Sequence, residues 1–155
     1  MYPVDFSSRI EVARTRKKGD LNCIGATFYL LGIDDKERLV DPIRSRARIL
    51  RSLSSIGHVK ASQSSFPENC SAVGVYSNTF QTFIHTGVVL PERDAIVHRS
   101  GYGKPLETVT LSDFINSYPR NEWFRYGVSF DYLVASHRQA TNWEMFMDKL
   151  HEWGL

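Results

Sequence analysis

The chain has 155 residues, of which 42% are apolar and 23% are charged. This length fits one domain over residues 1–155, which can bury a core without disulfides or metal ions. The composition excludes disordered, collagen-like and fibrous chains. A net charge of +2 gives no reason to expect a dedicated nucleic-acid binder, so no nucleic-acid partner is predicted.

Targeting signals and cysteine content restrict the cellular setting. Cys23 and Cys70 are too few for a disulfide scaffold. The N-terminus has no apolar run of signal-peptide length, and no stretch approaches the roughly 20 apolar residues that span a bilayer. We therefore expect no membrane span and a cytoplasmic location. Export without a cleaved signal, or injection as a toxin, is the alternative.

The first segment, residues 8–18, fits two structures. Ser8 and Glu11 have the spacing of a capping box, which favours a short helix. The alternation of Ile10 and Val12 equally suits a strand. Both alternatives stay open at this point.

Residues 20–32 have the pattern of a buried helix. Asp20 or Asn22 can cap its start, and Gly32 can close it. This places Cys23 in the first turn of an apolar helix. The positions i, i+4 and i+7 of one helix face are Ile24, Phe28 and Leu31.

A second helix is predicted after the polar loop 34–38. It begins at Asp41 and Pro42 and ends at Gly57. Its expected core stripe is Ile43, Ala47, Leu50 and Leu53. Its arginines fall off that stripe and form either a solvated face or a surface for a protein partner: Arg44, Arg46, Arg48 and Arg51.

From residue 58 the period becomes that of strands. Residues 58–78 are expected to hold one or two short strands, and residues 80–90 a strong one. A turn at residues 91–94 leads to a returning strand at residues 95–98.

The rest of the chain continues this order. A short strand at residues 106–110 is followed by a helical turn at residues 111–117, for which Ser112 is a plausible cap. Residues 123–130 are the last strand candidate. A terminal helix opens at Thr141, which has capping-box spacing to Glu144. Helices followed by antiparallel hairpins indicate an α+β fold.

Cys23 is the candidate nucleophile. A thiol attacks as thiolate, and a helix N-terminus or a nearby imidazolium favours that form. The backbone N–H groups of the same helical turn could stabilise an oxyanion. Cys70 has no comparable context. Close-paired zinc-ligand spacings and a G-x-S-x-G serine motif are absent from the sequence, so neither metal nor cofactor is predicted.

Two histidines are placed to serve Cys23. His85 lies in the strongest predicted strand, on one face with Phe83 and Gly87. His98 follows on the returning strand. If residues whose numbers sum to 184 or 185 pair across the turn, His98 lies opposite Thr86 or Gly87 and next to His85.

In order and spacing these motifs resemble the NlpC/P60 cysteine peptidases. The matching pieces are Asn22-Cys23-Ile24-Gly25, Tyr29-Leu30-Leu31-Gly32, His85-Thr86-Gly87-Val88-Val89-Leu90 and Ala95-Ile96-Val97-His98-Arg99-Ser100-Gly101. The resemblance covers about residues 20–112. The family usually has Asp-Cys-Ser-Gly around its nucleophile, where this chain has Asn-Cys-Ile-Gly.

The resemblance implies a papain-like fold and a Cys-His-His triad. Cys23 would be the nucleophile, His85 the general base and acid, and His98 the orienting residue. The expected activity is hydrolysis of a peptide or isopeptide bond, with cell-wall peptides as the first substrate class. The alternatives are a deamidase, transglutaminase-like or toxin enzyme, and a non-catalytic binding module in which Cys23 belongs to the core and the basic helix recruits a partner.

Overall fold

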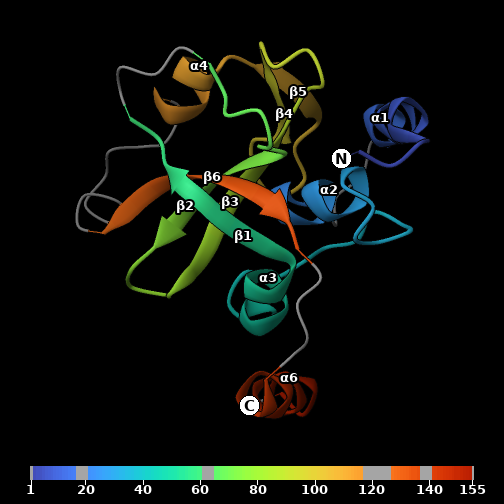
Figure 1. The fold of residues 1–155 in the computed structure, drawn as a ribbon. Coiled ribbons are helices and arrows are strands. Elements are labelled where there is room, and N and C mark those ends of the chain that lie inside the picture. Colours follow the sequence, from blue (N-terminus) through green and yellow to red (C-terminus); the bar gives the residue numbers. More distant parts are fainter. Residues whose placement is uncertain (1, 17–20, 61–64, 117–126, 137–140, 155) are drawn as a thin grey trace.

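A computed structural model describes residues 2–16, 21–60, 65–116, 127–136 and 141–154, and its architecture is α+β (Figure 1). Six antiparallel strands form one sheet in the order β1-β6-β2-β3-β4-β5. The strands are β1 (Leu53–His58), β2 (Ala72–Ser77), β3 (Thr82–Val89), β4 (Ile96–Arg99), β5 (Leu106–Val109) and β6 (Val128–Ala135). The helices are α1 (Phe6–Thr15), α2 (Cys23–Leu30), α3 (Arg46–Ser52), α4 (Leu111–Asn116) and α6 (Asn142–Glu152).

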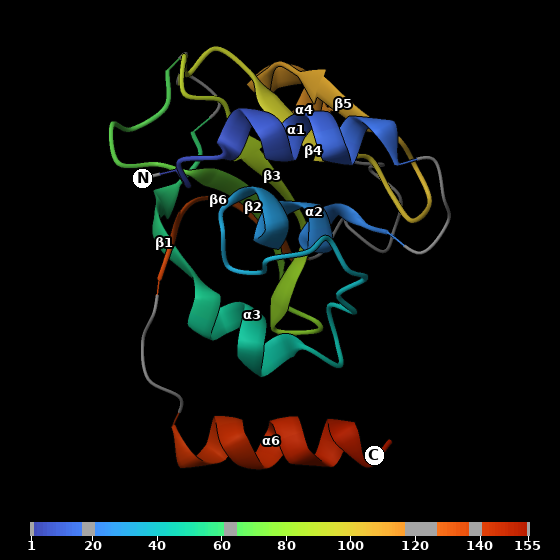
Figure 2. The same ribbon diagram turned by 90° about the vertical axis from the view of Figure 1, so that its right-hand side faces the viewer.

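Helices lie on both faces of the sheet. Figure 2 shows α1 and α2 in front of β3 and β4, with α4 behind them. Residue burial follows the same division. One core cluster joins Phe28 of α2 to Val88 and Val97 of the sheet, and a second joins Phe114 of α4 to Ile96. Among the described residues no helix is long and apolar enough to cross a membrane.

The predicted helix around Cys23 is confirmed. It runs over Cys23–Leu30, and the Asn22 side chain caps it by accepting the Gly25 N–H at 3.0 Å. Gly32, with φ of 76°, follows its end in the left-handed conformation that favours glycine. The ambiguous N-terminal segment is the helix α1, which starts at Phe6.

The predicted helix from Asp41 to Gly57 is wrong at both ends. Asp41 does accept the N–H groups of Ile43 and Arg44, but these bonds close a turn, and the helix begins only at Arg46. Ile43 is exposed rather than in the core. Leu53 opens β1 because residues 53–58 pair with β6, and this tertiary pairing overrides the helical spacing of the apolar side chains.

The hairpins lie close to where the sequence predicts them. β3 pairs with β4 through Val88↔Val97 and Val89↔Ile96, and both pairs sum to 185 as expected. The last strand begins at Val128, later than predicted, and residues 123–126 lie outside the described residues. At α4 the cap is Thr110, whose Oγ1 accepts the Asp113 N–H at 3.1 Å, rather than Ser112. The expected Thr141–Glu144 contact at the start of α6 is present.

Candidate active site

The two predicted histidines form a direct hydrogen-bonded pair. Nε2 of His85 lies 2.8 Å from Nδ1 of His98, and both side chains are buried. The two rings are nearly perpendicular, and Phe114 of α4 packs against each of them. The prediction that His98 lies beside His85 across the β3–β4 hairpin is therefore confirmed.

The neighbours of His85 on its face differ from the prediction. Between Val75 and Tyr76 the register with β3 shifts, so that Val75 lies opposite His85 and Tyr76 opposite Phe83. Ile84 is left as the extra residue of a β-bulge. The bulge breaks the alternation, so Phe83 packs in the core cluster of α2 while His85 lies on the face of α4.

Gly87 is closely surrounded by its neighbours. A Cβ atom at this position would lie 2.4 Å from Cγ2 of Ile96 and 3.2 Å from atoms of His98 and Phe114. The missing side chain therefore lets β4 and α4 pack closely around the histidine pair.

A third group, Glu107, extends the histidine pair. Its Oε1 lies 3.1 Å from Nε2 of His98, and β4 and β5 pair these two residues directly. A carboxylate only accepts, so His98 donates from Nε2 and accepts at Nδ1 from the Nε2–H of His85. This chain of bonds leaves the lone pair of His85 on Nδ1. The sequence analysis missed Glu107, although the spacing of the β4–β5 hairpin could have placed it opposite His98.

Cys23 occupies the first helical position of α2 and reaches the edge of β3. Its Sγ lies 3.9 Å from the carbonyl oxygen of Ile84, and the backbone N–H of Thr86 points to the sulfur. The Ile84 carbonyl and the Thr86 N–H lie on the edge of β3 that faces β4. Hydrogen-bonded pairing between β3 and β4 is limited to Val88 and Val89 of β3. The start of α2 thus contacts β3 at Ile84, before the two residues through which β3 pairs with β4.

The structure therefore brings the three predicted residues to one region in two different ways. His85 and His98 contact each other through their rings. Cys23 contacts the backbone of the residues on either side of His85, and none of its hydrogen bonds within the described residues goes to an imidazole. The Thr86 side chain, which bonds to Thr27 of α2 at 2.7 Å, shows that α2 packs on the face opposite to the histidine rings.

Burial keeps both reactive groups neutral. It raises the pKa of the Cys23 thiol to about 11, although the backbone N–H groups of Thr86, Ile24 and Cys23 itself lower it. The helix N-terminus alone thus does not produce the preformed thiolate that the sequence suggests. Burial, and to a smaller extent the neighbouring His98, lowers the pKa of His85 to about 3. Burial also lowers the pKa of His98, with the Glu107 carboxylate acting in the opposite direction.

A backbone segment covers the first turn of α2. The Asn22 amide donates to the carbonyl of Val40 at 2.7 Å, and its Oδ1 accepts the Val40 N–H at 3.3 Å. A Cβ atom at Gly25 would lie 1.7 Å from the carbonyl oxygen of Arg38. Glycine at this position is therefore what allows the loop before α3 to lie against the helix start next to Cys23.

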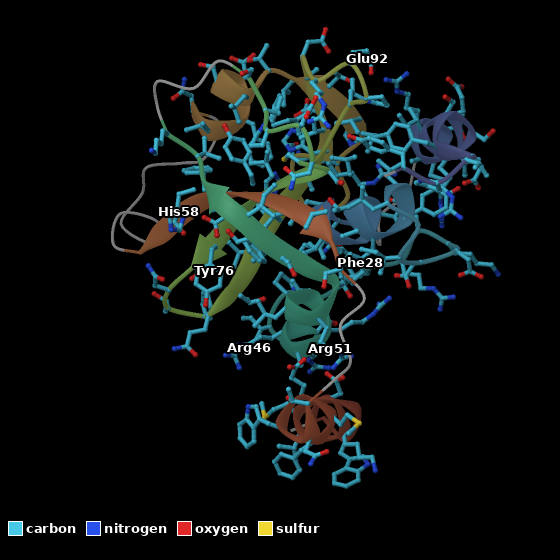
Figure 3. All side chains as sticks on the ribbon, viewed as in Figure 1. Phe28, Arg46, Arg51, His58, Tyr76 and Glu92 are labelled. Carbon is cyan, nitrogen blue, oxygen red and sulfur yellow. The ribbon has the colours of Figure 1, made fainter. Side chains whose placement is uncertain are left out.

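The other cysteine and histidines lie apart from this region. The Cys70 thiol is buried and donates to the carbonyl of Ala72 at 3.0 Å. His58, at the end of β1 and labelled in Figure 3, has its Nδ1 2.6 Å from Oδ1 of Asp131. His137 lies outside the described residues, as does the side chain of His151.

Three of the four arginines predicted as a partner surface contact the protein itself. Arg46 donates to the backbone and side chain of Gln81, and Arg48 bonds to Asp34 while its guanidinium lies over the Phe28 ring. The Arg51 side chain extends from α3 toward α6 (Figure 3) and pairs with Asp148 at 2.7 Å. Arg44 is exposed. The basic helix therefore serves to attach the loop before it, the β2–β3 turn and α6.

Metal ligands do not cluster in the described part of the chain, where no three His, Cys, Asp or Glu side chains come close enough to hold an ion. Comparison of the chain with protein-family models, with curated proteins and with solved structures gave no match.

Proposed function

We propose that this chain is a thiol-dependent amidase or peptidase with Cys23 as nucleophile, His85 as general base and acid, and His98 as the residue that orients His85. The papain-like arrangement is part of this proposal. The observation that carries it is the bond chain from Glu107 through His98 to His85, because it leaves the lone pair of His85 on Nδ1. The Cys23 sulfur lies at the backbone of Ile84, the residue before His85.

The reaction begins from a neutral thiol and a neutral imidazole. Sγ of Cys23 attacks the carbonyl carbon of the amide while its proton passes to Nδ1 of His85. The imidazolium then gives that proton to the departing amine nitrogen, and a thioester remains on Cys23. Water attacks the thioester, His85 takes its proton, and the thiol is restored as the acid leaves.

Backbone amides support the charge that develops in this reaction. The N–H groups of Cys23 and Ile24 at the start of α2, together with that of Thr86, point to the sulfur. Two of these donors belong to the N-terminus of α2 and the third to β3, and all three favour negative charge on the sulfur. The substrate class that we propose first is a peptide or isopeptide amide of the cell-wall type, and a protein amide is second.

The test uses a small activated acyl donor, p-nitrophenyl acetate, and follows acetylation of each cysteine by peptide mass mapping. We expect acetyl transfer to Cys23, with loss of p-nitrophenol release in Cys23→Ala. Cys70→Ala is the matched control because both thiols are free and buried. Equal acetylation of the two cysteines, or none on Cys23, would contradict the proposal and favour a binding module in which Cys23 is a core residue.

A further inference from the structure

A pocket of about 290 Å³ with cationic walls lies beside the start of α2. Four basic side chains line it: Arg14 from the last turn of α1, Arg16 just after that helix, Arg99 at the end of β4, and Lys104 from the loop between β4 and β5. Figure 2 shows the end of α1, the β4–β5 loop and the beginning of α2 close together. We call this site the cationic pocket.

Arg99 is the structural member of the pocket. Its Nε lies 2.6 Å from Oε2 of Glu37 and its Nη2 lies 2.9 Å from Oε1, and both side chains are almost fully buried. It also donates to the carbonyl groups of Ala13 and Lys104. Its charge is therefore balanced, and it holds the end of α1 and the β4–β5 loop in place.

The other three charges are not balanced in this way. Arg16 donates to the backbone carbonyl of Glu37 at 3.2 Å, and Arg14 donates to the Thr108 hydroxyl at 3.4 Å. Within the described residues, neither these arginines nor Lys104 forms an ion pair. Three like charges on one small pocket repel each other, and a bound anion would offset the electrostatic free energy of that repulsion.

The pocket is linked directly to the nucleophile's helix. Leu21, which also lines it, accepts the N–H of Gly103 through its carbonyl oxygen at 2.9 Å. Leu21 is followed by the helix cap Asn22 and then by Cys23. A group bound in the pocket would therefore lie against the segment that leads into α2.

We propose that the cationic pocket binds an oxyanion group of the substrate, a carboxylate or a phosphate, and thereby selects anionic acyl donors. This inference rests on the function proposed above. Arginine donates two parallel N–H bonds to either group, and lysine adds a compact charge. Arg14, Arg16 and Lys104 are the recognition residues, and Arg99 shapes the pocket.

The binding test titrates inorganic phosphate and, separately, succinate into the full chain by calorimetry at low salt. Saturable binding of one anion is expected, and the stronger of the two identifies the group. Arg16→Gln and Lys104→Gln should each weaken binding about tenfold, the value of one charge-assisted bond. Arg44→Gln, which removes one exposed arginine elsewhere, is the charge-matched control and should bind like the parent.

The same titration in Cys23→Ala separates this inference from the proposed function, because binding of the anion does not need the thiol. If the anion still binds to Cys23→Ala, and Cys23 of the parent is never acetylated, the proposed thiol-dependent activity is wrong but the oxyanion site is supported. If neither anion binds saturably, or if Arg44→Gln weakens binding as much as Arg16→Gln, the pocket is not an oxyanion site.

Discussion

Nε2 of His85 and Nδ1 of His98 share a hydrogen bond of 2.8 Å in the interior of the protein. Both nitrogens would carry a proton if both rings were charged, so the bond requires that at least one ring is neutral. Burial satisfies this requirement because it lowers the pKa of both histidines. The His85–His98 pair is thus neutral, and its hydrogen bond favours one tautomer of each ring.

His98 is predicted to orient His85 without moving protons itself. His98→Gln keeps a hydrogen-bonding group and should retain part of the rate of p-nitrophenol release. His98→Ala should lose one to three orders of magnitude, or roughly 1.4–4 kcal/mol of barrier. His85→Ala should fall to the level of Cys23→Ala. If His98→Ala matches the parent while circular dichroism shows it folded, His98 has no part in the reaction.

Glu107 is predicted to fix the tautomers of both histidines. Without its carboxylate, His98 loses the acceptor that keeps the proton on Nε2. In Glu107→Ala we expect the ¹⁵N shifts of both rings to move toward a mixture of tautomers, with a rate loss of about tenfold. Asp113→Ala, which removes an exposed acid in the neighbouring helix, is the control. Unchanged ¹⁵N shifts in Glu107→Ala would show that the contact does not set the tautomer.

The pH dependence of the rate should lack the inflection of an ordinary histidine. Because the pKa of His85 is lowered to about 3, the base stays neutral throughout the range around pH 6.5. We therefore expect kcat/KM for the acyl donor to stay flat as the pH falls through that range. An inflection of kcat/KM near pH 6.5 would contradict this assignment.

Stability should depend on the same histidine. The ordinary pKa is 6.5 and the value in the folded protein is about 3, so the unfolded chain binds more protons between these values. The contribution of neutral His85 to the free energy of unfolding is complete above pH 6.5 and is lost as the pH falls toward 3. Urea unfolding at a series of pH values should show this slope, and His85→Gln should flatten it.

The buried pair of Glu37 and Arg99 is expected to be sensitive to removal of one partner. In Glu37→Gln the Arg99 guanidinium keeps its charge without a carboxylate, which should lower the free energy of unfolding by about 3–5 kcal/mol. Glu37→Met combined with Arg99→Met should cost less than the sum of the two single changes. Urea denaturation of the parent, Glu37→Gln, the two single methionine variants and the double variant measures these losses. Additive losses would show that the two charges do not depend on each other.

The sequence by itself determined the local features of the site. The helix that carries Cys23 near its start, a polar cap at Asp20 or Asn22, and the turn that sets the pairing of β3 with β4 follow from side chains close in the chain. Such signals survive folding because caps and tight turns are made by neighbouring residues. For the same reason the juxtaposition of His85 and His98 could be predicted from one hairpin.

Tertiary structure decided the rest. The helical pattern predicted over residues 41–57 ends at Leu53, because residues 53–58 pair with β6, a strand far away in sequence. The bulge at Ile84 moved Phe83 and His85 to opposite faces, which no alternation pattern encodes. The pKa of Cys23 is raised because α2 is buried against β3, and burial is a property of the packed molecule. The cationic pocket likewise exists only where α1, α2 and the β4–β5 loop meet, so its charges are scattered along the sequence and gather only in the fold.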